Sequence, residues 1–108
     1  MDLIEFETAL RTPPEMSQNE RTMAIQKIIS CNGTEKQHVI VMEELAELIQ
    51  QVSKHLRGKG NNLALLEEMA DVVICMEMLS HMDYISKSQI EDAVAVKLQR
   101  KLHRIQEK

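Results

Sequence analysis

The stretch at residues 69–79 reads MADVVICMEML. Its only charged residues are Asp71 and Glu77. A helix that is apolar nearly all round is buried on most of its sides. The sequence therefore predicts a buried helix that has Asn62 as its candidate N-cap and ends at about Met82.

The rest of the chain is also expected to be helical. Its three glycines and two prolines lie in small clusters between long segments of helical periodicity. The further helices are expected at residues 1–11, 17–31 and 35–57, and from residue 86 or 88 to near the C-terminus. Their N-cap signals are Ser17 with Glu20, Thr34 with Gln37, and either Ser86 with Gln89 or Ser88 with Glu91. Short turns between long helices predict an all-α, antiparallel helical bundle.

Length and charge narrow the possible classes of protein. The 108 residues fit one domain, and the formal net charge of -4 argues against attraction of the whole protein to nucleic acid or to an anionic membrane. No apolar run approaches the roughly 18–20 residues of a membrane span, and the N-terminus lacks a signal-peptide pattern. Cys31 and Cys75 lack metal-type spacing and are expected to be reduced thiols. We therefore expect a cytoplasmic protein.

The helix at 35–57 combines an apolar stripe with an acidic flank. The stripe, at spacings of four and three, consists of Val41, Leu45, Leu48, Val52 and Leu56. Such a stripe is expected to face a core. Glu44 and Glu47 lie at i,i+3 on its flank, and Glu43 lies further round the helix.

A second acidic pair, Glu68 and Asp71, lies in the apolar helix. On the helical wheel the pair falls among Ala64, Cys75 and Leu79. An ionised carboxylate in such surroundings is unfavourable unless it is paired or binds a cation. Two acidic pairs on neighbouring helices can face each other, and all-oxygen ligands favour Mg²⁺, or Mn²⁺, over zinc. The alternative is that these acidic residues, Glu43, Glu44 and Glu47 on one helix and Glu68 and Asp71 on the other, belong to ordinary solvated helix surfaces.

The last helix has a basic face. Lys97, Arg100, Lys101 and Arg104 recur at i, i+3, i+4 and i+7. One interpretation is a solvated face near a helix C-terminus, where cations interact favourably with the helix dipole. The other is a clamp for phosphate groups. Lys54, on the same side of its helix as Glu47, is a further candidate phosphate ligand.

The two acidic motifs resemble those of a known family. Residues 43–47 (EELAE) and 68–71 (EMAD) match the EExxE and ExxD motifs of the MazG-like, all-α nucleotide pyrophosphohydrolases. The resemblance covers roughly residues 20–105 and includes the turn 57–59 (RGK) and the segment 97–100 (KLQR). It implies a MazG-like domain at residues 17–108, preceded by a variable extension at residues 1–16.

The resemblance also implies a reaction and a site. The reaction is cleavage of a nucleoside triphosphate to a monophosphate and pyrophosphate by a metal-activated water. The implied Mg²⁺ ligands are Glu44, Glu47, Glu68 and Asp71. Glu43 would lie behind the ligands or position the water, so the catalytic candidates are Glu43, Glu44 and Glu47. The phosphate-binding candidates are Lys54, Lys97, Arg100 and Arg104.

Base recognition is expected to use polar groups. The chain has one Phe, one Tyr and no Trp, and Phe6 and Tyr84 both lie outside the acidic motifs. Proteins often bind a nucleobase by stacking it on aromatic rings, and this chain has few aromatic side chains for that purpose. Gln37 and Gln51 are the candidate contacts, together with aliphatic and Met side chains.

Three hypotheses follow. The leading one is the Mg²⁺-dependent nucleoside triphosphate pyrophosphohydrolase. The second is a non-enzymatic helical oligomerisation module with a structural cation. The third keeps the family and changes the substrate to phosphoribosyl-ATP or dUTP. Because the helix at 62–82 is apolar on too many faces for one small bundle, we also expect a homodimer or homotetramer with this helix near the interface.

Overall fold

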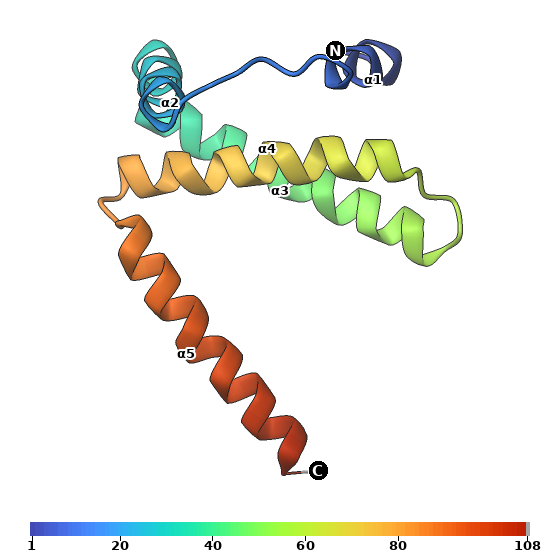
Figure 1. The fold of residues 1–108 in the computed structure, drawn as a ribbon, viewed down its shortest axis with the longest axis vertical. Coiled ribbons are helices and arrows are strands. Elements are labelled where there is room, and N and C mark those ends of the chain that lie inside the picture. The colour runs from blue at the N-terminus through green and yellow to red at the C-terminus, as the bar shows by residue number, and fades with distance from the viewer. Residues whose placement is uncertain (108) are drawn as a thin grey trace. The chain divides into compact units, whose positions relative to one another are not determined.

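The computed structural model describes residues 1–107, and every regular element in that range is an α-helix. The helices are α1 (Leu3–Leu10), α2 (Gln18–Asn32), α3 (Thr34–Leu56), α4 (Asn62–Met82) and α5 (Lys87–Gln106) (Figure 1). The prediction of an all-α fold is confirmed. Residue 108, the last of the predicted MazG-like domain, lies outside the described residues.

The chain divides into two compact units, Met1–Met78 and Leu79–Lys108. The first unit contains α1, α2, α3 and most of α4. The second contains the end of α4, a turn and α5. The predicted boundary between residues 16 and 17 stays a prediction. No helix of the described part of the chain is long and apolar enough to cross a membrane.

Side-chain caps start several of the helices. The Ser17 hydroxyl accepts from the Glu20 amide, and the Ser86 hydroxyl accepts from the Gln89 amide, each at 3.1 Å. Both capping boxes were predicted, and of the two candidates for α5 the structure uses Ser86. A further box at Asp2, which starts α1, was not predicted.

Two predicted caps are wrong. Helix α3 has Gly33 at its N-cap with φ 81°, so Thr34 does not cap it and no side chain does. Gln37 instead turns into the interior. At α4 the cap is Asn61 rather than Asn62, because Asn61 Oδ1 accepts from the amides of Leu63 at 2.8 Å and Ala64 at 3.2 Å.

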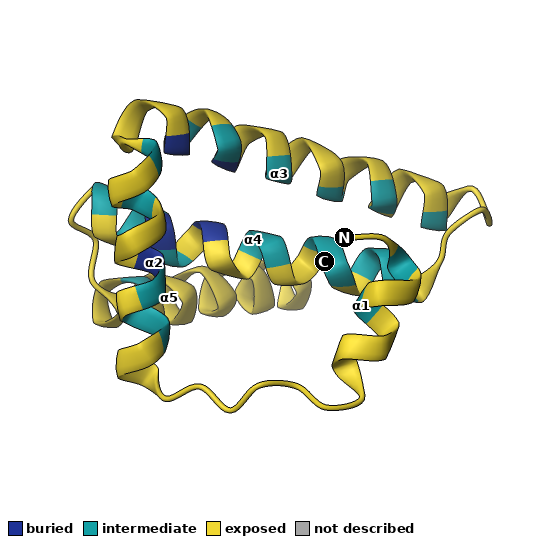
Figure 2. Cartoon of the chain, turned by 90° about the horizontal axis from the view of Figure 1, so that it is seen from above, coloured by how far each residue is buried: buried dark blue, intermediate teal, exposed yellow. Residues whose placement is uncertain are grey.

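The core of the first unit lies where α2, α3 and α4 meet. Its buried apolar residues are Ile25, Val41, Cys75 and Met78 (Figure 2). An ion pair between Arg21 and Glu77 joins α2 to α4, with Arg21 Nε donating to Glu77 Oε2 at 2.9 Å. This core fixes α3 and α4 side by side, joined by the turn at 57–61.

The predicted core-facing stripe of α3 is wrong in its orientation. Val41 is buried, but Val52 is 54% exposed and Leu56 is 89% exposed. Besides His38 and Ile40 near its start, the positions of α3 that are at least half-buried are Gln37, Val41, Glu44, Leu48, Gln51 and His55 (Figure 2). They recur at four and three, so α4 covers the acidic flank of α3. The apolar stripe is left largely open in the single chain.

Helix α4 is only partly covered in the single chain. Only Cys75 and Met78 are buried, while Met69 is 50% exposed and Val73 is 51% exposed. Burial of its remaining faces by self-association stays a prediction. One neighbouring hairpin arm and α2 do not provide enough surface to cover all faces of an apolar helix.

Candidate metal site and adjoining pocket

Three carboxylates from α3 and α4 form a cluster. Glu44, Glu68 and Asp71 each offer one oxygen, and these three oxygens lie within 4.8 Å of one another. All three residues are half-buried. Glu68 and Asp71 share a face of α4 because residues three apart are neighbours on a helix. Glu44 faces them because the acidic flank of α3 lies against α4.

The cluster carries uncompensated charge. Burial, followed by repulsion from Asp71 and Glu47, raises the pKa of Glu44 from 4.5 to about 7. Burial, followed by repulsion from Glu47, raises the pKa of Glu68. Glu44 Oε2 and Glu68 Oε2 are buried without a hydrogen-bond partner. Buried carboxylate oxygens without donors are unfavourable, so the cluster favours a bound cation.

The geometry fits a hard divalent ion. Ligand oxygens of Mg²⁺ lie about 2.1 Å from the ion, so two opposite ligands are about 4.2 Å apart. The three oxygens, within 4.8 Å of one another, therefore need only small side-chain rotations to meet one ion. The donor set is all oxygen and anionic, which matches Mg²⁺ or Mn²⁺.

The remaining acidic candidates lie outside this group of three. Glu47 is exposed, yet its charge acts on both Glu44 and Glu68. It is therefore close enough to join the group when a cation neutralises the repulsion. Glu43 is exposed on α3. The roles assigned to Glu43 and Glu47 stay predictions.

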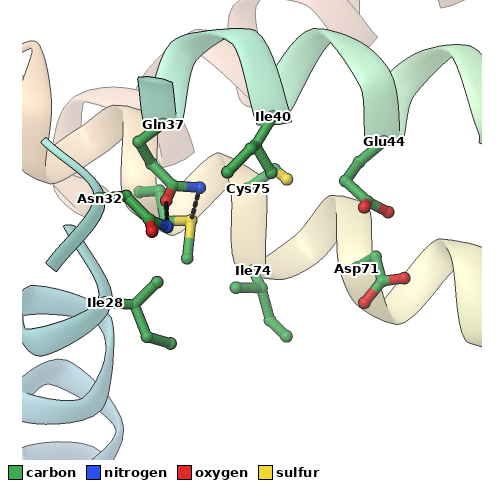
Figure 3. Close-up of a pocket in the computed structure, with 9 residues that line it drawn as sticks. Ile28, Asn32, Gln37, Ile40, Glu44, Asp71, Ile74 and Cys75 are labelled. Atoms are coloured by element: carbon green, nitrogen blue, oxygen red, sulfur yellow. Dashed lines mark hydrogen bonds between the residues drawn. The ribbon is translucent and has the colours of Figure 1, made fainter. Parts of the chain in front are cut away.

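A pocket of about 160 Å³ adjoins the cluster. It is lined by Ile28, Asn32, Gln37, Ile40, Glu44, Asp71, Ile74, Cys75 and Met78. Figure 3 shows Glu44 and Asp71 at one end and Gln37 with Asn32 at the other. Burial, and then the charges of Glu44 and Asp71, raise the pKa of the Cys75 thiol to about 11, so the thiol stays protonated.

The amide end of the pocket is held by two hydrogen bonds. Asn32 Nδ2 donates to Gln37 Oε1 at 2.8 Å, and Gln37 Nε2 donates to Met78 Sδ at 2.9 Å (Figure 3). The sequence had suggested both Gln37 and Gln51 as polar contacts, and the structure brings only Gln37 into this pocket. Asn32 was not among the predicted contacts. Its place next to a buried glutamine depends on the crossing of α2 and α3, which no local pattern reveals.

The basic candidates are exposed residues of two helices. Lys54 is exposed on α3. Lys97, Arg100 and Arg104 are exposed on α5, which belongs to the second compact unit. Their assignment as phosphate ligands stays a prediction.

Comparison of the chain with known proteins identifies no similar protein. No family model, no curated protein and no solved structure matches this chain.

Proposed function

We propose that the protein is a Mg²⁺-dependent nucleoside triphosphate pyrophosphohydrolase of the MazG-like type. The observation that supports this most is the carboxylate cluster of Glu44, Glu68 and Asp71. Its oxygens lie within 4.8 Å of one another, and two buried oxygens have no donor. The adjoining pocket gives the cluster a binding space lined mainly by apolar side chains, which a surface patch of glutamates would lack.

The cluster would hold the ion, with Glu47 as the fourth ligand. When bound, Mg²⁺ or Mn²⁺ supplies positive charge to the phosphate oxygens and makes a water molecule a better nucleophile. Glu43 would orient that water from the solvent side of α3. The water oxygen forms a bond to the α-phosphorus, and the bond from this phosphorus to the bridging oxygen of the β-phosphate breaks. The products are a nucleoside monophosphate and pyrophosphate, and the protons of the water pass to solvent.

Positive side chains would bind the rest of the triphosphate. Lys54 on α3 and Lys97, Arg100 and Arg104 on α5 are the chain's candidates for this role. Arg suits phosphate because its planar group donates two parallel hydrogen bonds. These contacts would stabilise the negative charge that develops on the pyrophosphate as it leaves.

The active form would be a homodimer or homotetramer acting in the cytoplasm. The large apolar residues left exposed on α3 and α4 support self-association, because burial between subunits would remove these side chains from water. The same exposure favours the second candidate function, a non-enzymatic oligomerisation module with a structural cation.

Two measurements separate these functions. Pyrophosphate release with Mg²⁺, measured over a panel of nucleoside triphosphates that includes dUTP and phosphoribosyl-ATP, should show turnover by the wild type and none by Asp71→Asn. Thermal unfolding should show that Mg²⁺ raises the Tm of the wild type and not that of Asp71→Asn, because a cation that binds the native state stabilises it. Stabilisation by Mg²⁺ without turnover on any of these nucleotides would favour the structural module.

A further inference from the structure

Gln37 is the most deeply buried polar side chain of the core, at 1% exposure. Its amide nitrogen donates to Met78 Sδ at 2.9 Å. A thioether sulfur is a weak acceptor, so this N–H is poorly used by the protein itself. Its oxygen accepts from Asn32 at 2.8 Å and keeps a second lone pair. The amide is therefore held in place and still has bonding capacity for a ligand.

The amide lies at a defined place relative to the carboxylates. Gln37 and Glu44 are on the same face of α3, seven residues apart, which is about 10 Å along a helix axis. Side chains of Ile40 and Ile74 lie between the two ends of the pocket, and Ile28 lines it near the amide end (Figure 3). The pocket thus has an anionic end suited to a metal–phosphate group, an apolar middle and an amide end.

We propose that Gln37, held by Asn32, reads the hydrogen-bonding edge of the base and sets the base preference of the enzyme. This proposal depends on the proposed function. The base lies between isoleucine side chains without aromatic stacking, and Gln37 Nε2 exchanges its bond to Met78 Sδ for one to a ring nitrogen or carbonyl oxygen of the base. A side-chain amide offers an adjacent donor and acceptor, which matches the edge of a nucleobase.

The test compares Gln37→Met with Gln51→Met. Methionine is similar in length to glutamine and lacks both hydrogen-bonding groups. Gln51 lies on the same flank of α3 and does not line the pocket, so it is the matched control. The readout is kcat/KM for pyrophosphate release from the four natural deoxynucleoside triphosphates and from a benzimidazole nucleoside triphosphate, whose base lacks an amide-complementary edge.

The proposal expects a selective loss. Gln37→Met should lower kcat/KM for the preferred base by about tenfold or more and leave the benzimidazole substrate unchanged, while Gln51→Met should behave as wild type. An equal loss on all substrates, or an unchanged preference, would overturn it. Should Gln37→Met fail to fold, the wild type decides, because it must prefer its best natural base over benzimidazole by about tenfold or more. A wild type that releases no pyrophosphate from any nucleotide refutes the proposed function instead.

Discussion

Among the carboxylates of the site, Glu44 has a pKa that is raised to about 7 by its surroundings. Its carboxyl group is held near Asp71 and within range of Glu47 and Glu68, and its pKa is raised to about 7 by burial and then by these charges. The cluster therefore destabilises the metal-free fold whenever its carboxylates are ionised. A bound cation would offset the repulsion between these carboxylates. Metal binding should therefore stabilise the folded state.

Metal-free stability should fall as pH rises from about 4.5 to about 7. The folded pKa of Glu44, about 7, exceeds its ordinary value of 4.5, so the native state binds more protons than the unfolded state within this window. Glu44→Gln should flatten this fall, while Glu43→Gln, an exposed neighbour, should retain it. The measurement is Tm against pH in chelator-containing buffer, and identical profiles for wild type and Glu44→Gln would contradict the assigned environment.

At the scale of elements, the α3–α4 hairpin positions the cluster, and its turn is tightly packed. A Cβ at Gly60 would lie 2.8 Å from the Cα of His55 and would also meet the His55 ring. Gly58, at φ 72°, has open space around it. The two glycines therefore serve different purposes, one allowing close approach and the other a left-handed backbone.

Gly60→Ala should destabilise the protein by about 1–3 kcal/mol, because the new methyl group meets backbone as well as a side chain. Gly58→Asn is the control, since asparagine tolerates the left-handed region, and it should cost less than about 1 kcal/mol. Urea unfolding measures both. A Gly60→Ala variant as stable as Gly58→Asn would show that the turn can move away from His55.

Helix α5 presents its basic residues to solvent, and their charge should matter for turnover more than for folding. Lys97→Ala and Arg100→Ala should each change stability by about 0.5 kcal/mol or less. Each should lower kcat/KM on a triphosphate by about ten- to hundredfold, through loss of a charge-assisted phosphate contact. Lys87→Ala, at the start of the same helix, is the control. If both variants keep the wild-type kcat/KM, the basic face does not bind phosphate and is an ordinary solvated surface.

The sequence predicted the helices well because their ends are encoded locally. Ser17 and Ser86 cap helices through residues three positions away, and Gly33 ends α2 at a positive φ. The apolar stripe predicted the wrong face of α3 toward α4, whereas the two acidic pairs indicated the face that meets α4 in the structure. That face depends on how two apolar helices share the available surface, and here the flank with Gln37 and Glu44 is covered.

At the scale of the whole molecule, the chain has more apolar surface than its own fold covers. Ile49 is 69% exposed and Val52 54% exposed on α3, and Met69 and Val73 are about half exposed on α4. Spacing alone predicted that Glu68 and Asp71 share a face. The acidic pairs of the two neighbouring helices were also expected to face each other, and Glu44 lies with Glu68 and Asp71 in the structure. The pocket beside them could not be predicted, because it depends on how α2, α3 and α4 cross.

Self-association should cover this surface. Light scattering at micromolar concentration should show a dimer or tetramer for the wild type. Ile49→Lys should shift it toward smaller species, because a charge placed in an apolar interface is unfavourable. Gln50→Lys, an exposed polar neighbour, should leave the assembly intact. A stable, active monomer of the wild type would contradict the predicted assembly.

The proposed reaction is attack of water on the α-phosphorus at the Glu44, Glu68 and Asp71 site. Hydrolysis of the preferred nucleoside triphosphate in ¹⁸O-labelled water with Mg²⁺, followed by mass spectrometry of both products, tests this reaction. We expect ¹⁸O in the nucleoside monophosphate, unlabelled pyrophosphate, and no reaction with Asp71→Asn or with chelator. Label in the pyrophosphate, or undiminished turnover by Asp71→Asn, would contradict it.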